Sequence, residues 1–370
     1  MRPEPCLATD VSREAMESLV RTFERAARLG LPGVGTEHLL FALLKGQSAA
    51  VEVLVPKAGA AGSLMGVVAH RHPGQWISED GGGDPAPAAA ALLREAEWSA
   101  RKKREGRTGD EQPGAPAPPS AALAAAIDRA LLSAREHGAA RAGTTHLLIG
   151  LLQDPGNRAS EALEERGLDR REVLARLAVH PSAREDGTPN ALSVDGLRNM
   201  GLLTRRGRFW GGLAAKLSGG GHGSPMVPTV RLEAERQAVR LGHATVTTVH
   251  LLVAMLVLDE QLAAAGDRLR DDLAGLNGAA GLLRERGATA AAAAAASAGL
   301  APAGEFVPDE DGPAWRALAR ARRLAQERGD ASTGTVHVLT ALLDDPDDPC
   351  GGLLASIGVD VAELRRALAA

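Results

Sequence analysis

The sequence has few of the residues that build β-sheet cores or disulfide-linked folds. Its 370 residues include four Trp, four Phe and no Tyr. A core with so few rings must be filled by Leu, Val and Ala, which favours helices over a β-sandwich. The two cysteines, Cys6 and Cys350, are too few for a disulfide framework or a Cys-rich zinc site.

Long apolar runs and a large excess of one charge are also missing. The apolar stretch Leu251–Leu258 is far shorter than the ~20 residues that span a bilayer, and no apolar signal segment follows Met1. The formal charge of −4 gives no global attraction to nucleic acid or to anionic membranes. With 45% hydrophobic and 24% charged residues, the composition is globular. These features predict a soluble cytoplasmic protein without membrane contacts.

One phrase, [GT]-T-x-H-[LV]-L-x-x-[LM]-L, occurs four times along the chain. The copies lie at residues 35–44, 143–152, 247–256 and 334–343. Copies two and four align without a gap over the residues that follow, so that Gly167 matches Gly358 and Leu177 matches Leu368. The larger unit is therefore a duplicated pair of repeats.

This duplication predicts two domains. The first covers residues 10–180, and the second covers 224–370, with a linker at 181–223. Within the first domain, residues 73–119 are a Gly-, Pro- and Ala-rich insertion that contains an amphipathic helix. Within the second, the alanine-rich residues 288–304 lack a core pattern and are predicted to be a linker.

Each repeat has the pattern of helices. Apolar residues at 39, 40, 43 and 44 share one helical face, and a longer amphipathic segment such as Ser12–Leu29 precedes the phrase. The Thr of the phrase is expected to cap its helix through its hydroxyl; the four are Thr36, Thr144, Thr248 and Thr335. The predicted fold is all-α, with two tandem domains that are each a pseudo-duplicated bundle of short helices.

With these motifs, the chain resembles the Clp N-terminal domain family, the double-repeat helical module that precedes the AAA+ rings of Clp unfoldases. In that family each repeat contains G-T-E-H-[IL]-L-x-G-L-[IL], and a helix-opening Thr motif begins 27 residues before the His. That distance leads to Val11-Ser12 in repeat one and to Pro119-Ser120 in repeat two. No G-x-x-x-x-G-K-[ST] loop occurs in these 370 residues. The chain is thus expected to resemble two Clp N-domains without an ATPase, and not to be an enzyme.

The four histidines of the phrase could suggest a metal or catalytic site. Each lies in the first turn of its own helix, where a neutral imidazole can bond a neighbouring turn, so a structural role is favoured. These residues are His38, His146, His250 and His337. No metal and no cofactor is expected. No G-x-S-x-G or H-E-x-x-H motif occurs either, which leaves a hydrolase as the least supported alternative.

The resemblance implies a more specific binding site. Some family members receive phosphoarginine through the helix-opening Thr and the Glu of G-T-E-H, and a helix N-terminus with a carboxylate suits such a ligand. Repeat one keeps both elements as Ser12 and Glu37. Repeat two has Ser120 but Thr145, and Val249 and Val336 replace the Glu in repeats three and four. The alternative is that Ser12 is only a helix cap and Glu37 only a solvated charge.

Two further features bear on ligands. The family's aromatic residue in a peptide-, adaptor- and antibiotic-binding groove is replaced here by Val11 and Pro119, which keeps apolar character but not the aromatic anchor. Arg-rich clusters occur at residues 101–107 and 205–210. The leading prediction is a non-enzymatic protein that binds peptide-like ligands, adaptors or Clp ATPase components and modulates Clp-dependent proteolysis as a decoy or by sequestering Clp-directed peptides or antibiotics. A nucleic-acid-binding regulator using the Arg clusters is the second prediction, with nucleic acid the less favoured partner.

Overall fold

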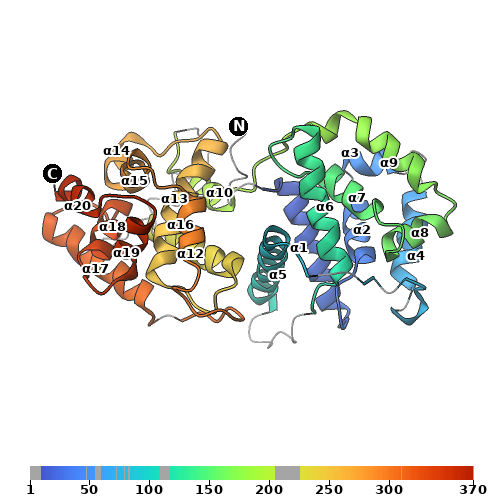
Figure 1. The fold of residues 1–370 in the computed structure, drawn as a ribbon, viewed down its shortest axis with the longest axis horizontal. Coiled ribbons are helices and arrows are strands. Elements are labelled where there is room, and N and C mark those ends of the chain that lie inside the picture. The colour runs from blue at the N-terminus through green and yellow to red at the C-terminus, as the bar shows by residue number, and fades with distance from the viewer. Residues whose placement is uncertain are drawn as a thin grey trace. The chain divides into compact units, whose positions relative to one another are not determined.

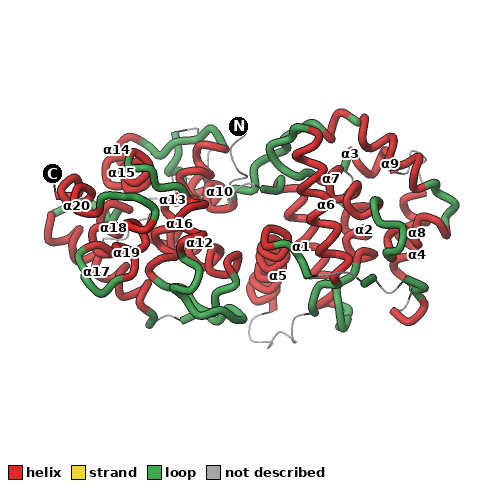
Figure 2. The backbone as a smooth tube through the Cα atoms, in the orientation of Figure 1, coloured by secondary structure: helices red, strands yellow, loops and turns green. Residues whose placement is uncertain are grey.

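The structure is a computed structural model, and its regular structure is helical. It describes residues 10–46, 48–54, 60–71, 73–78, 80–81, 84–108, 117–204, 226–309 and 311–369. Within those ranges, helices are joined by loops that contain only isolated β-bridges (Figures 1 and 2). The all-α prediction is therefore confirmed. Two compact units are present: an N-terminal unit, Asp10–Asn190, and a C-terminal unit that includes Ala191–Ala370.

The N-terminal unit contains the first two repeats. Its helices are α1 (Arg13–Arg28), α2 (Thr36–Lys45), α3 (Ala49–Leu54), α4 (Ala60–His70), η1 (Pro73–Gln75), α5 (Pro87–Thr108), α6 (Ala121–His137), α7 (Thr144–Leu152), α8 (Arg158–Glu165), α9 (Arg170–Val179) and η2 (Pro181–Ala183). The repeated phrases form α2 and α7, and the longer helices before them are α1 and α6. The two repeats thus have the same order of a long helix followed by a short one.

Local sequence signals explain where these helices begin and end. The hydroxyl of Ser12 accepts a hydrogen bond from the backbone N–H of Ala15, and that of Ser120 accepts one from Leu123, so both serines cap their helices. Helix α6 ends at Gly138, whose φ of 81° lies in the left-handed region that glycine enters without strain.

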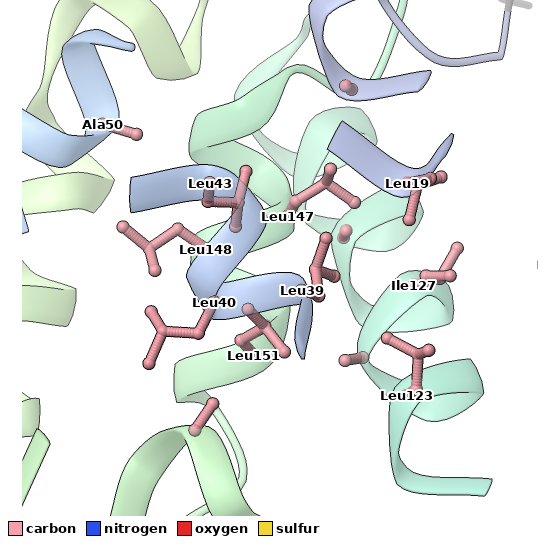
Figure 3. Close-up of a cluster of buried hydrophobic side chains, with 14 of the residues drawn as sticks. Leu19, Leu39, Leu40, Leu43, Ala50, Leu123, Ile127, Leu147, Leu148 and Leu151 are labelled. Carbon is pink, nitrogen blue, oxygen red and sulfur yellow. The ribbon is translucent and has the colours of Figure 1, made fainter. Parts of the chain in front are cut away.

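The core of the N-terminal unit is built mainly from aliphatic side chains of α1, α2, α6 and α7. Figure 3 shows Leu39, Leu40 and Leu43 of α2 facing Leu147 and Leu148 of α7. All of these leucines are buried. The close packing of α7 on α6 needs a glycine, because a Cβ at Gly150 would lie 2.1 Å from the carbonyl oxygen of Ala126. The apolar face predicted for the phrase is thus the core face.

The C-terminal unit contains repeats three and four. Its helices are α10 (Leu192–Asn199), α12 (Met226–Leu241), α13 (Thr248–Ala264), α14 (Asp271–Ala274), η3 (Gly275–Asn277), α15 (Ala279–Glu285), α16 (Ala290–Ala296), α17 (Pro313–Arg328), α18 (Thr335–Leu343), α19 (Pro349–Ser356) and α20 (Val361–Ala369). Helix α13 is central: it packs against α10, α12, α15, α16, α17, α18 and α19. Its residues 248–258 are buried without interruption, which explains why this phrase continues into a longer apolar stretch.

The predicted linkers differ from the structure. The alanine-rich segment was expected to be a linker, but it forms α16, whose Ala290, Ala293 and Ala294 are buried and which packs on α13. Alanine has the highest helix propensity and fills a close helix contact, so a core pattern of larger residues is not needed. Of the predicted linker 181–223, η2 belongs to the N-terminal unit and α10 packs on α12 and α13. Residues 205–223 lie outside the described residues.

Candidate functional site

The four histidines of the phrase cap their own helices. In each copy the imidazole Nδ1 accepts a hydrogen bond from the backbone N–H of the residue before the helix. The pairs are Gly35 with His38, Gly143 with His146, Thr247 with His250, and Gly334 with His337, at 2.9, 2.9, 2.9 and 3.0 Å. This is a capping box with His in the place usually taken by Glu or Gln. It requires an unprotonated Nδ1.

The environments of His38 and His250 also favour the neutral imidazole. Burial, followed by the positive charges of Arg25 and Arg158, lowers the pKa of His38 to about 4. Burial and the neighbouring His243 lower the pKa of His250 to about 3. In the described part of the chain, no group of three or more His, Cys, Asp or Glu side chains could hold a metal ion. The histidines of the phrase therefore act as structural residues.

The threonines of the phrase do not cap their own helices. Thr36, Thr144, Thr248 and Thr335 are the first helical residues, and the cap is the residue before them. The prediction that they were caps was wrong by one position, because each Thr already has helical backbone geometry and the preceding residue has the extended geometry of a cap. The Thr36 hydroxyl makes tertiary contacts instead. It donates to the Asp80 carboxylate at 2.6 Å.

The start of each repeat in the N-terminal unit lies beside the phrase of the other repeat. Val11 forms a parallel bridge with Ala142, next to α7, and the backbone N–H of Ser12 donates to the Ala142 carbonyl at 2.9 Å. Pro119 forms the matching bridge with Val34, next to α2. The predicted pairing of Ser12 with Glu37 within repeat one is therefore wrong. In space, Ser120 lies beside the phrase that contains Glu37, and Ser12 lies beside the phrase that contains Thr145.

Each helix start and the phrase beside it form a site that combines residues of both repeats, which we call a crossed site. In the first crossed site, around Glu37 and Ser120, an internal carboxylate takes the place of a ligand. Asp80 accepts hydrogen bonds from the Thr36 backbone N–H at 3.0 Å, the Thr36 hydroxyl at 2.6 Å and the Ser120 hydroxyl at 2.5 Å. Asp80 is only 3% exposed, and its φ of 53° is one that Asp tolerates better than most residues. The N-terminus of α2 and the cap of α6 thus share one buried anion that the chain supplies.

An internal guanidinium occupies the acidic part of the same site. Arg158 Nη1 lies 3.0 Å from Glu37 Oε1, and Glu37 is 3% exposed. Burial raises the pKa of the Glu37 carboxyl, against the opposing effect of Arg158. Glu37 is thus not the solvated charge of the alternative reading. Asp80 thus bonds the helix start and the serine hydroxyl, and Arg158 the glutamate, that the sequence predicts for the phosphate and the guanidinium of a phosphoarginine.

The second crossed site, around Ser12 and Thr145, is also covered by the chain. The Thr145 and Ser182 hydroxyls share a hydrogen bond of 2.7 Å. The Arg13 backbone N–H donates to the Thr188 carbonyl at 2.8 Å. A Cβ at Gly187 would lie 2.8 Å from that of Ser12, so only glycine permits this close approach. Val11, Ser12 and Thr145 are all buried. The apolar groove predicted at Val11 is therefore closed, whereas Pro119 and Ser120 are half-buried.

In the C-terminal unit the corresponding positions are apolar. Val249 is buried and Val336 is half-buried, so neither phrase offers a carboxylate to a guanidinium. The N-terminus of α18 is capped from outside the helix, where the Thr335 backbone N–H donates to Asn277 Oδ1 at 3.0 Å.

The Arg clusters differ in what the structure shows of them. Residues 101–104 lie on α5, where Lys102 stands over the Trp98 ring and Lys103 lies 3.7 Å from Glu24. Those cations are thus used within the unit. The cluster at 205–210 lies outside the described residues. No helix among the described residues is both long and apolar enough to cross a bilayer.

Comparison with known proteins gives one match to a family. Residues 312–370 match the model of the family described as "Clp repeat (R) N-terminal domain". Among solved structures, the chain is similar to the N-terminal domain of the caseinolytic protease associated chaperone ClpD from Arabidopsis thaliana. That similarity has 14% identity and a TM-score of 0.30, and it covers 45% of this chain and 92% of the other. No relative was found among the curated proteins.

The family match falls on repeat four, from the residue before α17 to the end of α20. The predicted Clp-repeat resemblance is confirmed for this stretch. The other three copies share its phrase and its His-capped helix start.

Proposed function

We propose that these 370 residues form a non-enzymatic binding protein that modulates Clp-dependent proteolysis. The observation that supports this is that a stretch matching the Clp repeat family has the same His-capped helix start as the three other copies, so that each unit holds two of the four. Four copies of one binding module, with every phrase histidine used for structure, favour a binding role over catalysis. The partner class is an adaptor, a peptide-like ligand or a component of a Clp ATPase.

The occupied sites of the N-terminal unit restrict how such binding can occur. Asp80 and Arg158 fill the site at Glu37, and residues 182–188 cover Ser12 and Thr145. A phosphoarginine ligand would have to displace a buried ion pair and several hydrogen bonds to enter. We therefore propose that the partner is recognised through exposed surfaces of the repeats, and that wild-type chain gives no binding heat with phosphoarginine.

The experiment is a degradation assay with a bacterial Clp unfoldase, its peptidase and fluorescein-labelled casein. Added in excess over the unfoldase, the chain should change the rate of casein degradation. It should leave cleavage of a short fluorogenic peptide by the peptidase alone unchanged. Bovine serum albumin at the same concentration is the control for nonspecific competition. An unchanged rate, together with no co-sedimentation of the chain with the unfoldase, would refute the proposal.

A further inference from the structure

A basic groove lies between the C-terminal halves of α1 and α2 in repeat one. It has a volume of about 500 Å³ and is lined by Arg21, Glu24, Arg25, Arg28, Phe41, Ala42, Lys45 and Gly46. This volume falls within the ~300–1,000 Å³ of ligand pockets. Four of the lining residues are cationic and one is anionic. The anion is Glu24, whose carboxylate lies 3.7 Å from the ammonium group of Lys103 on α5, so its charge is shared with a cation outside the groove.

Three cations of this groove, Arg25, Arg28 and Lys45, are not neutralised, and Arg25 is also held in place. The Arg25 guanidinium lies 3.8 Å from the centre of the Phe41 ring, which fixes it by a cation–π contact. Its Nε is buried and has no hydrogen-bond partner. Within the described ranges, Arg25, Arg28 and Lys45 form no ion pair. The groove therefore presents several positive charges around one concave surface.

The simplest alternative is that these cations only stabilise the ends of α1 and α2, since positive charge is favourable at a helix C-terminus. The other repeats argue against it. In repeat four a groove of about 410 Å³ lies at the same place, but its charged residues are Arg320, Arg323, Glu327, Asp344 and Asp345. Anions there outnumber cations, although this groove also lies at the C-terminal ends of the long and the short helix of its repeat.

The residue at the position of Gly46 accounts for much of the difference in charge between these grooves. Repeats two and four have Asp154 and Asp345 at the matching position. These aspartates pair with the arginines that match Arg21: Arg129 with Asp154 at 3.5 Å, and Arg320 with Asp345 at 3.1 Å. In repeat one Gly46 provides no carboxylate, and Arg21 pairs instead with exposed Glu17 on its own helix. In repeat three the matching residues Arg236, Gln237 and Arg240 are buried.

We propose that the α1–α2 groove of repeat one is a binding site for acidic peptide segments. This inference deepens the proposed function by naming the ligand chemistry and a surface distinct from the occupied sites at Glu37 and Ser12. Several carboxylates can be satisfied together by Arg25, Arg28 and Lys45. Nucleic acid fits less well, because base stacking needs a free aromatic face and Arg25 covers Phe41.

The test is fluorescence anisotropy of the full chain with fluorescein-labelled hexaglutamate at low salt. Binding is expected for hexaglutamate and not for hexaglutamine, and it should weaken as salt rises. Arg25→Gln should reduce the affinity by roughly tenfold or more, the range for a hydrogen bond to a charged group. Arg171→Gln, an exposed arginine of α9, is the matched control and should leave the affinity unchanged.

A second variant tests the comparison between repeats. Gly46→Asp should abolish hexaglutamate binding by supplying the carboxylate that repeats two and four have, whereas Gly46→Asn should retain it. Gly46 has a φ of −73°, so both side chains suit its backbone, and circular dichroism checks that both variants fold. Equal binding by the two variants, equal binding of hexaglutamine, or tighter binding of a dT12 oligonucleotide would overturn the inference. If the chain alters casein degradation but does not bind hexaglutamate, the proposed binding site is refuted and the proposed function is not.

Discussion

Removing the Asp80 carboxylate should destabilise the N-terminal unit, because this side chain joins two helices that belong to different repeats. In Asp80→Ala the Thr36 backbone N–H and hydroxyl lose their acceptors at 3.0 and 2.6 Å. Thr36 is fully buried, so water cannot replace them. The half-buried Ser120 hydroxyl can form a hydrogen bond with water instead, so its bond is not counted in the predicted loss of stability.

The two bonds from Thr36 set the size of the effect. Hydrogen bonds to a charged group contribute about 1.5–3 kcal/mol each, so a lower figure of about 3 kcal/mol follows for Asp80→Ala. For a unit of this size, 1 kcal/mol shifts the melting temperature by roughly 2–4 °C, which gives a loss of roughly 6–12 °C. Asp80→Asn keeps one acceptor oxygen and tolerates the φ of 53°, so its loss should be about half as large.

Thermal unfolding followed by circular dichroism measures these shifts. The matched control is Asp84→Ala, an exposed aspartate four residues away in the same segment, which should change stability by less than about 0.5 kcal/mol. If Asp80→Ala melts together with Asp84→Ala, the carboxylate does not hold the start of α2. The description of the site at Glu37 as internally occupied would then be wrong.

Three other changes test the helix starts and the core. His38→Gln keeps the capping bond but cannot titrate. The pKa of His38 is about 4 when folded and 6.5 when unfolded, so the stability of the wild type should fall as the pH drops from 6.5 to 4, by up to ~1.4 kcal/mol per pH unit. Urea unfolding at pH 7.5 and at pH 5 should show a smaller fall in stability for the variant. Gly150→Ala should destabilise α7 against α6 despite its better helix propensity, whereas Gly66→Ala, with open space around it, should gain about 0.5–1 kcal/mol in thermal melts. Leu148→Ala should cost about 2–5 kcal/mol by the same measurement, and a neutral result would place the phrase outside the core.

The parts of the structure that follow from local pattern were predictable from the sequence. The phrase predicted short helices with an apolar face, and Leu39, Leu40 and Leu43 lie on that face in the core. The structural role expected for the histidines agrees with their hydrogen bonds, since a side chain at the third helical position can reach back to the backbone N–H at its own helix start. The Thr cap was misplaced by one residue because the helix begins at Thr36 itself, whose hydroxyl donates to Asp80, a residue far away in the chain.

The contacts that close the candidate site could not be predicted, because they join residues far apart in the chain. Asp80 lies in an insertion without repeat pattern, and Arg158 follows the second phrase by several residues, so neither belongs to the motif that suggested the site. The contact of each helix start with the phrase of the other repeat is equally non-local. Val11, for example, pairs with Ala142, which lies 131 residues further along the chain. Alignment of the phrases finds Glu37, but only the packed unit shows what stands against it.

The groove of repeat one shows the opposite case, in which the sequence held a signal that the phrase alone does not reveal. When the repeats are aligned through their histidines, Gly46 falls where Asp154 and Asp345 stand, and Lys45 falls where Asp344 stands in repeat four. Both repeats have a groove between the same pair of helices, of about 500 Å³ in repeat one and about 410 Å³ in repeat four, so these substitutions change the charge of a groove that both repeats keep. Duplication therefore supplies an internal control: a fold that tolerates both charges does not need the cations for stability. In repeat three the cation that matches Arg28, Arg240, is buried, so accessible cations at these positions are a feature of repeat one that fits a ligand with negative charge.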